Sequence, residues 1–165
     1  MSIALSEING LSREEFTRVV GPVFEHSPWI AESAAAQRPF PTRAALHAAM
    51  CAIVQHAAEE KQLALICAHP DLVGRVVLTA ESTREQTAAG LMQLTPEEVA
   101  AFDRFNTEYK TRFGFPFIIC ARKNKKEAIL SAFPVRLKNS RETEIRTALD
   151  QTFQIAELRL ADLIA

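Results

Sequence analysis

The chain has 165 residues, of which 48% are hydrophobic and 24% are charged, and its formal net charge is -1 at pH 7. A chain of this length and composition can bury a sizeable core, so we expect one globular domain over residues 1–165. The near-neutral charge excludes attraction to nucleic acid by bulk charge. No apolar stretch approaches the length of a membrane span, so we expect no membrane association.

The cysteines indicate the redox environment. Cys51, Cys67 and Cys120 are odd in number, far apart and set among apolar residues. This pattern argues against a disulfide framework and against a zinc site. We therefore expect reduced, buried thiols, no bound metal and a cytoplasmic protein.

The first part of the chain carries three helix starts. Ser12 and Glu15 have capping-box spacing, and the helix that they open should end near Gly21. A second helix should begin at Pro28, and a third after Thr42, which precedes apolar residues at helical period. These patterns predict amphipathic helices that pack on a common core.

A histidine follows the next apolar helical run. Residues 61–68 read as a helix, and Pro70 disfavours helical geometry at His69. The imidazole should therefore be presented at a helix end instead of lying inside a helix. One interpretation is a proton carrier at a functional site, and the other is an ordinary residue stabilised by the helix dipole.

A second polar pattern follows closely. We expect residues 71–78 to form a short connection or a loosened helical turn. Ser82 and Glu85 then have capping-box spacing, which predicts a helix over residues 83–92. The pair is interpreted either as a plain helix cap or as the polar partners of His69, and spacing alone does not choose.

The second half begins with the clearest start signal in the chain. Thr95, followed by a proline and by Glu98, predicts a long helix that ends at Gly114. Residues 115–120 are apolar, too few for a helix and without a partner strand. Their backbone groups need partners outside a sheet, so the segment is either a packed loop in the core or the floor of a ligand site.

Two further helices complete the pattern. Residues 125–133 should form one helix that leads to Pro134, and Ser140 should cap a long final helix. Arg159 lies at the edge of the apolar face of that last helix. It is interpreted either as a surface partner of Asp162 or as a guanidinium that grips a ligand's carboxylate or carbonyl oxygens.

The sequence therefore predicts an all-α fold, a single-domain bundle of about seven to eight helices with short connections. Within this pattern, six stretches resemble the 2-oxo-4-hydroxy-4-carboxy-5-ureidoimidazoline (OHCU) decarboxylases of urate breakdown. They occur in the family's order and cover nearly the whole chain. The stretches are 23–29, 68–72, 79–86 with 89–91, Phe105-Asn106 with Tyr109, 112–117 and 158–160.

The resemblance implies an all-helical decarboxylase without a cofactor, which converts OHCU into (S)-allantoin and forms a homodimer. It implies that His69 and Glu85 are the catalytic pair. The residues that it assigns to substrate binding are Pro70, Ser82, Gln86, Phe117, Ile118, Ile119 and Arg159. The connection between Leu72 and Thr79 is a few residues shorter than in the typical member, which affects the expected shape of the pocket more than the reaction.

Two other interpretations belong to different classes. A non-catalytic helical module could use the same cavity to bind a purine metabolite or a partner helix, and it would not need the pair of His69 and Glu85. A purely structural all-α protein is disfavoured, because it gives no joint explanation for the apolar segment 115–120 and the polar motifs.

Overall fold

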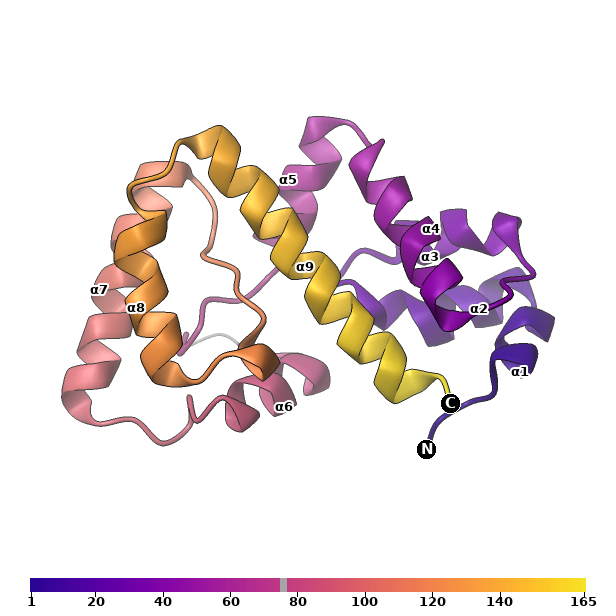
Figure 1. Ribbon diagram of the computed structural model, residues 1–165, viewed down its shortest axis with the longest axis horizontal. Coiled ribbons are helices and arrows are strands. Elements are labelled where there is room, and N and C mark those ends of the chain that lie inside the picture. The colour runs from indigo at the N-terminus through magenta and orange to yellow at the C-terminus, as the bar shows by residue number, and fades with distance from the viewer. Residues whose placement is uncertain (75–76) are drawn as a thin grey trace. The chain divides into compact units, whose positions relative to one another are not determined.

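The structure is a computed structural model that describes residues 1–74 and 77–165 (Figure 1). Over these residues the regular elements are helices, with one isolated bridge between Ile3 and Ile164 and no named strand. The α-helices are α1 Leu5–Gly10, α2 Arg13–Val20, α3 Pro28–Ala34, α4 Arg43–Gln55, α5 Glu59–Cys67, α6 Ala80–Ala88, α7 Pro96–Phe113, α8 Lys126–Arg136 and α9 Arg141–Leu163. Three short 3-10 turns are η1 Gly21–Val23, η2 Ala35–Gln37 and η3 Ala121–Lys123. The predicted all-α class is confirmed.

The helix starts predicted at Ser12, Thr42 and Thr95 from capping signals are confirmed. Ser12 and Thr95 each accept a hydrogen bond from the backbone N–H three residues on, and the glutamate there bonds back to the cap residue. Thr42 accepts from Ala45 N at 3.0 Å at the start of α4. Gly114 ends α7 in the left-handed region, with φ at 82°. Each signal acts through a local side-chain bond or a local backbone angle, which explains why sequence alone suffices.

Helix α1 was not predicted and raises the number in the described residues to nine. Its N-cap is Ala4, whose side chain cannot accept a hydrogen bond. The start is held instead by Glu7, whose Oε2 accepts from the N–H of Ala4 at 3.2 Å. The usual sequence signal of a cap residue is therefore absent from this start.

Helix α6 begins three residues earlier than predicted. Its cap is Thr79, whose hydroxyl oxygen accepts from Ser82 N at 3.1 Å. The prediction that Ser82 and Glu85 form a cap was therefore wrong, because both lie inside the helix, one turn apart. The expected end at residue 92 was also wrong, since the helix ends at Ala88.

Helix α8 also differs from its prediction. It continues past Pro134 to Arg136, although a proline removes one helical hydrogen bond. Pro134 is exposed and lies in the last turn of the helix, where few bonds remain to be lost. The predicted connection of residues 71–78 contains residues 75 and 76, which lie outside the described residues.

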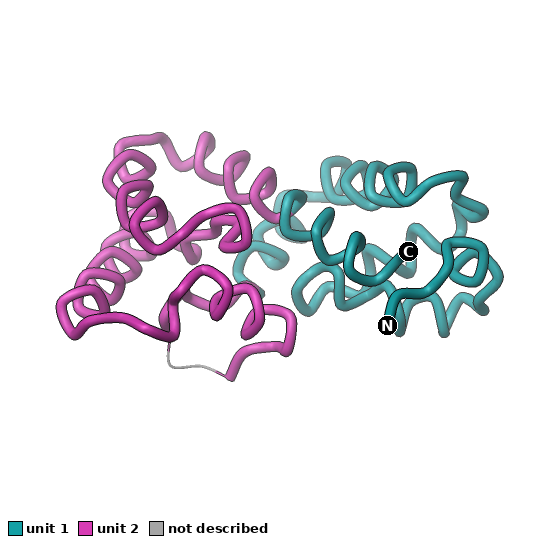
Figure 2. The backbone as a smooth tube through the Cα atoms, turned by 60° about the horizontal axis from the view of Figure 1, so that its bottom comes forward, with its two compact units in different colours: residues 1–68, 153–165 teal, residues 69–152 magenta. Residues whose placement is uncertain are grey.

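The chain divides into two compact units (Figure 2). Unit 1 comprises residues 1–68 and 153–165, and unit 2 comprises residues 69–152. Helix α9 contributes its first half to unit 2 and its second half to unit 1. Unit 1 is therefore discontinuous in sequence, whereas unit 2 is one continuous stretch.

The core of unit 1 is mainly aliphatic. Helix α3 packs against α2 and α4, and the ring of Phe24 meets that of Phe153 edge-on at 6.5 Å between centroids. Backbone hydrogen bonds also join the two ends of the chain here, from Ile3 N to Leu163 O at 2.8 Å and from Ala165 N to Ile3 O at 3.0 Å. The fully buried side chains of this core include Ile8, Phe16, Val20, Ile30, Leu46, Met50, Val54, Leu65 and Leu160.

The core of unit 2 is aromatic. Tyr109 on α7 lies within 5.9 Å, between ring centroids, of three phenylalanines, Phe113, Phe115 and Phe117. Phe117 in turn stacks on Phe133 of α8 at 3.8 Å. The segment 115–120 supplies two of these rings, so it belongs to the core of unit 2. This agrees with the interpretation of the segment as a packed loop in the core.

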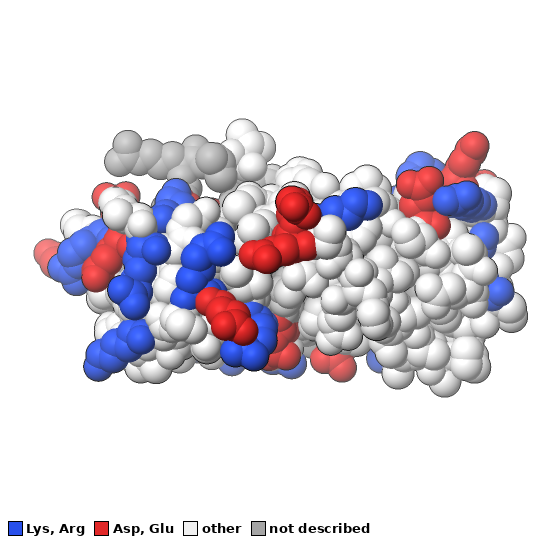
Figure 3. Space-filling view, turned by 90° about the horizontal axis from the view of Figure 1, so that it is seen from above, with Lys and Arg blue, Asp and Glu red and all other residues white. Residues whose placement is uncertain are grey.

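Charge is distributed unevenly between the units. Of the nineteen Lys and Arg residues, thirteen belong to unit 2 and six to unit 1. Of the twenty Asp and Glu residues, eleven belong to unit 2 and nine to unit 1. On the face drawn in Figure 3, basic side chains are interspersed with acidic ones. None of the helices in the described part of the chain is both long and apolar enough to cross a membrane.

Candidate functional site

The site begins where helix α5 ends. The helix ends at Cys67, and Ala68 caps it with a backbone bond to Ala64 O at 3.0 Å. His69 and Pro70 follow outside the helix, and both are half-buried. The predicted position of His69, just past a helix end and outside helical geometry, is therefore confirmed.

A tight turn follows the histidine. Gly74 N donates to Asp71 O at 3.2 Å, and a Cβ at Gly74 would lie 3.1 Å from that same oxygen. Val73 has a φ of 59°, which is strained for a β-branched residue by about 1–3 kcal/mol. Such strain persists only where neighbouring groups hold the backbone in place.

The side chain of Gln86 on α6 helps to keep this backbone in place. Its Oε1 accepts from Val73 N at 3.2 Å, and its Nε2 lies 3.5 Å from Asp71 O. Gln86 was assigned to substrate binding by resemblance. The structure shows that its amide bonds the turn after His69 and so joins that turn to α6.

One face of α6 carries three buried polar side chains. Ser82, Glu85 and Gln86 are spaced three and four residues apart, so they point to the same side of the helix. Their exposed fractions are 6%, 9% and 4%. A hydroxyl, a carboxylate and an amide on an inward helix face are costly to bury in an ordinary core, and this arrangement is typical of a site.

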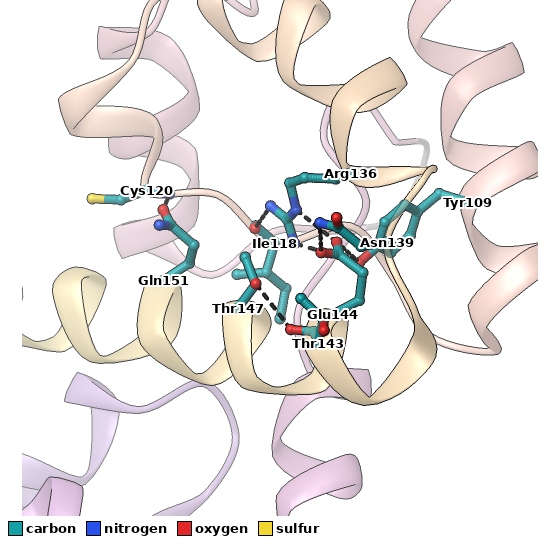
Figure 4. Close-up of polar contacts among 9 residues, drawn as sticks. All are labelled: Tyr109, Ile118, Cys120, Arg136, Asn139, Thr143, Glu144, Thr147 and Gln151. Carbon is teal, nitrogen blue, oxygen red and sulfur yellow. Dashed lines mark hydrogen bonds and ion pairs between the residues drawn. The ribbon is translucent and has the colours of Figure 1, made fainter.

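The extended segment 115–120 is buried along its whole length. Figure 4 shows how its backbone is held: Arg136 Nη1 donates to Ile118 O, and Cys120 N donates to Gln151 Oε1 at 2.9 Å. The guanidinium carbon of Arg136 also lies 4.1 Å from the ring centroid of Phe117. Side chains of α8 and α9 thus satisfy backbone groups that a sheet would otherwise satisfy.

Arg136 itself belongs to a buried polar network. Its Nε donates to Glu144 Oε1 at 2.7 Å, and Tyr109 Oη donates to the same oxygen at 2.6 Å. Asn139 Nδ2 donates to the other carboxylate oxygen at 3.0 Å. Burial, and then the bond to Glu144, raise the pKa of Tyr109. Sequence reasoning missed this network, because the bonded residues carry no recognisable motif.

Helix α6 and the end of the extended segment lie together. Helix α6 packs against η3, which directly follows Cys120, and Lys125 Nζ donates to Ala88 O at 2.8 Å. Burial raises the pKa of the Cys120 thiol, and the negative charge of Glu85 raises it further, while Lys123 opposes both effects. Unit 2 therefore brings the turn after His69, the polar face of α6 and the segment ending at Cys120 into one neighbourhood.

Arg159 belongs to unit 1 and is buried there. Its Nη1 donates to Glu25 Oε2 at 2.9 Å and lies 3.3 Å from Pro22 O. The side chains of the pair are 5% and 1% exposed. The interpretation of Arg159 as half of a surface pair was therefore wrong. Glu25 lies in a stretch that carries the resemblance, but no spacing rule could link residues so far apart.

Potential metal ligands do not cluster in the described part of the chain. In residues 1–74 and 77–165, no three His, Cys, Asp or Glu side chains gather in a way that could hold a metal ion. The three cysteines are free thiols. Cys120 is buried and Cys51 half-buried, but Cys67 is exposed, so the prediction of a buried thiol is wrong for that residue.

Comparison with known sequences identifies relatives over almost the whole chain. A profile of a family described as OHCU decarboxylase matches residues 9–161. A Haloferax volcanii protein named 2-oxo-4-hydroxy-4-carboxy-5-ureidoimidazoline decarboxylase is 42% identical over 97% of this chain and 95% of its own length. The uric acid degradation bifunctional protein PucL of Bacillus subtilis is also 42% identical over 97% of this chain, which spans 32% of that protein.

Comparison with solved structures gives the same picture. A crystal structure titled (S)-allantoin synthase matches with a TM-score of 0.82 and 30% identity. The match covers 98% of this chain and 54% of that one. The similarity therefore extends through both units in fold as well as in sequence.

Proposed function

Because this chain belongs to the OHCU decarboxylase family, we propose that it is a carboxy-lyase that converts OHCU into (S)-allantoin during urate breakdown. The observation that carries the proposal is the arrangement in unit 2. The turn that follows His69 is bonded by Gln86, one of three buried polar side chains on α6, and the charge of Glu85, another of the three, acts on Cys120 at the end of a buried extended segment. That combination fits an enzyme site better than a packed core.

The chemistry needs an electron sink and a proton carrier. Cleavage of the bond to the carboxylate releases carbon dioxide and leaves an electron pair on a ring carbon. The neighbouring carbonyl or imine of the substrate takes up that pair, so hydrogen-bond donors aimed at its oxygen or nitrogen stabilise the transition state. In this proposal the substrate is its own sink, and the protein supplies position, donors and a proton.

The proposed roles are assigned to the residues that the family resemblance implies, according to the chemistry of each residue type. His69 carries an imidazole, the side chain best suited to proton exchange near neutral pH, and exchanges a proton with the substrate hydroxyl or the nascent carbanion. Glu85 fixes the tautomer of His69 or holds the ureido group of the substrate. Ser82 and Gln86 orient the ring, and the backbone of residues 117–119 lines the site together with Pro70. Protonation from one fixed face then gives a single enantiomer.

The domain, assembly and location are part of the proposal. Both units form one family domain over residues 1–165, which the profile match across residues 9–161 supports. The free thiols support a reducing, cytoplasmic location. A homodimer is expected from the resemblance, and light scattering on the purified protein measures it.

The proposal is tested by the circular dichroism of the allantoin formed. Urate, urate oxidase and hydroxyisourate hydrolase generate OHCU in the cuvette, with and without this protein. Rapid appearance of one enantiomer is the expected result, since the spontaneous reaction gives a racemate. A slow racemic product equal to the blank would instead favour a non-catalytic module that binds a purine metabolite or a partner helix.

Substitution of the histidine tests its role. We expect His69→Ala to lower kcat by about 10²- to 10⁴-fold, the usual contribution of general acid–base catalysis. His56→Ala is the matched control, because His56 is exposed at the C-terminal cap of α4. Unchanged far-UV circular dichroism must accompany both variants. Near-normal turnover by a folded His69→Ala protein contradicts the assignment.

A further inference from the structure

The turn that follows His69 is held from a second helix besides α6. Asn106 on α7 donates from Nδ2 to Leu72 O at 2.7 Å. One turn along the same helix, Lys110 Nζ lies 2.7 Å from Asp71 Oδ2. Because Gln86 bonds the same turn from α6, residues 71–73 are held by side chains from two helices.

The Asn106 contact is buried, whereas the Lys110 contact is open to solvent. Asn106 is 7% exposed and Leu72 is 6% exposed, whereas the lysine side chain is 47% exposed. A buried bond to a carbonyl is worth more than a solvent-screened ion pair, since water cannot replace the lost partner. The bond from Asn106 is therefore the stronger of the two contacts that α7 makes with the turn.

The other end of the Asn106 amide has no partner in the described part of the chain. Its Oδ1 is a buried acceptor without a hydrogen bond. Leaving a buried acceptor unsatisfied is unfavourable, and an apolar residue of similar size would avoid that cost. The asparagine is explained only if the donation from Nδ2 to Leu72 O is worth more than the cost of its unpaired oxygen.

The bond can influence His69 because little freedom separates the two residues. Leu72 is three residues from His69, and Pro70 between them has a fixed φ. Val73, next to Leu72, is in a strained backbone conformation that needs external support. Without the Asn106 bond, relaxation of this strain would move the turn, and the imidazole would move with it.

We propose that Asn106 is a positioning residue for the reaction, which fixes His69 by holding the carbonyl of Leu72. The effect of Asn106 on turnover rests on the proposed function. The hold of Asn106 on the turn does not. Asn106 does not need to touch the substrate. It acts through the turn of residues 71–74 and through His69.

The experiment compares Asn106→Leu and Asn106→Asp with Thr107→Ala. Leucine keeps the size of the side chain and removes both polar atoms, and aspartate keeps the shape but replaces the donor by an oxygen. Thr107 is exposed on the next position of α7, so its variant controls for changes in the helix itself. We expect both Asn106 variants to lower kcat about 10- to 100-fold with a smaller change in KM, and the control to match wild type.

Two readouts separate positioning from a general structural role. In a His69→Ala background, Asn106→Leu should cause no further loss of rate, because its effect passes through the imidazole. Hydrogen exchange at the amides of Val73 and Gly74 should quicken in the Asn106 variants and stay unchanged in Thr107→Ala. Full activity of a folded Asn106→Leu protein, or an equal rate loss with and without His69, overturns the proposal.

The exchange measurement also separates the two proposals. If wild type makes no (S)-allantoin, the proposed function fails, while faster exchange at Val73 and Gly74 in the variants still supports the hold on the turn. If wild type is active and exchange is unchanged in both Asn106 variants, the positioning role fails by itself. If Asn106→Leu does not fold, Asn106→Asp provides the same comparison with a side chain of native shape.

Discussion

Each unit buries an arginine–glutamate pair, and the two pairs are built differently. In unit 2, Arg136 and Glu144 are eight residues apart and join the consecutive helices α8 and α9. In unit 1, Arg159 and Glu25 are 134 residues apart. Both arginines also donate from Nη1 to the carbonyl of a residue outside the α-helices, Ile118 in one case and Pro22 in the other.

The difference in sequence separation assigns different tasks to the two pairs. The pair in unit 2 closes a short loop, so little chain entropy is lost when the pair forms. The Glu144 carboxylate also accepts hydrogen bonds from Tyr109 and Asn139. It mainly fixes the segment 115–120 beside the candidate site. The pair in unit 1 joins the two distant stretches from which that unit is made, so it mainly determines whether unit 1 holds together.

Removal of the shared carboxylate in unit 2 should have the largest effect on stability. In Glu144→Ala, a guanidinium, a phenol and an amide lose their buried acceptor, and we expect a loss of about 3–5 kcal/mol in the free energy of unfolding. Urea denaturation measures it. Glu142→Ala, at an exposed position of the same helix, should change stability by less than about 0.5 kcal/mol. A loss as small as in this control would mean that the network contributes little.

Neutralising the glutamate of unit 1 should have the next largest effect. Glu25→Gln keeps an acceptor for Arg159 but removes the opposite charge, so we expect a loss of about 2–3 kcal/mol by urea denaturation. The control is Glu32→Gln, which breaks the exposed pair with Arg13, where both side chains are more than half exposed. That control should lose at most about 1 kcal/mol. Equal losses in the two variants would remove the distinction between buried and exposed pairs.

Arg159→Lys separates the structural role of the arginine from its predicted role in substrate binding. Lysine keeps the charge but cannot offer a planar fork, so we expect a stability loss of about 1–2 kcal/mol. If Arg159 also binds substrate, KM should rise or kcat fall beyond the change in the exposed control Arg146→Lys. Normal kinetics in a less stable protein would leave Arg159 with its structural role alone.

Tyr109→Phe should have the smallest effect and a distinct pH dependence. It removes one of three donors to Glu144, with a loss of about 1 kcal/mol at neutral pH. Because burial and the bond to Glu144 raise the pKa of Tyr109, the native state favours the neutral phenol. This contribution is complete below the unfolded value of about 10 and is lost as the pH rises through the native pKa.

Wild type should therefore lose stability above about pH 10 more steeply than Tyr109→Phe. Tyr109 is the single tyrosine of the chain, so the absorbance of tyrosinate titrates this residue alone. Titration at the ordinary pH of a free tyrosine would show that the phenol is not buried as described.

The predictable part of the fold was the part encoded by local bonds. The caps at Ser12, Thr42 and Thr95 and the left-handed Gly114 each act within a few residues, and all were predicted. Helix α6 was misplaced because Thr79 and Ser82 are both good cap residues three positions apart. The spacing of polar residues does not tell which of two such residues caps the helix.

For the candidate site, the sequence predicts the positions of some residues in their helices but not their contacts. The position of His69 past a helix end follows from Pro70, and the shared inward face of Ser82 and Glu85 follows from helical spacing once the helix is placed. The bond from Asn106 to Leu72 spans 34 residues and ends on a backbone carbonyl, so no side-chain pattern marks it. The long separation in sequence also hid Glu25 as the partner of Arg159.

The discontinuity of unit 1 has a consequence for how the protein is made. Residues 1–68 leave the ribosome long before residues 153–165, which supply Leu160 and Ile164 to the same core. All of unit 2 is synthesised between these two stretches. The unit that is started first is therefore completed last, reversing the usual order in which N-terminal parts fold first. Until residues 153–165 emerge, Phe24 lacks the ring of Phe153, and Arg43 and His47 of α4 lack the carbonyl groups of this last stretch to which they bond.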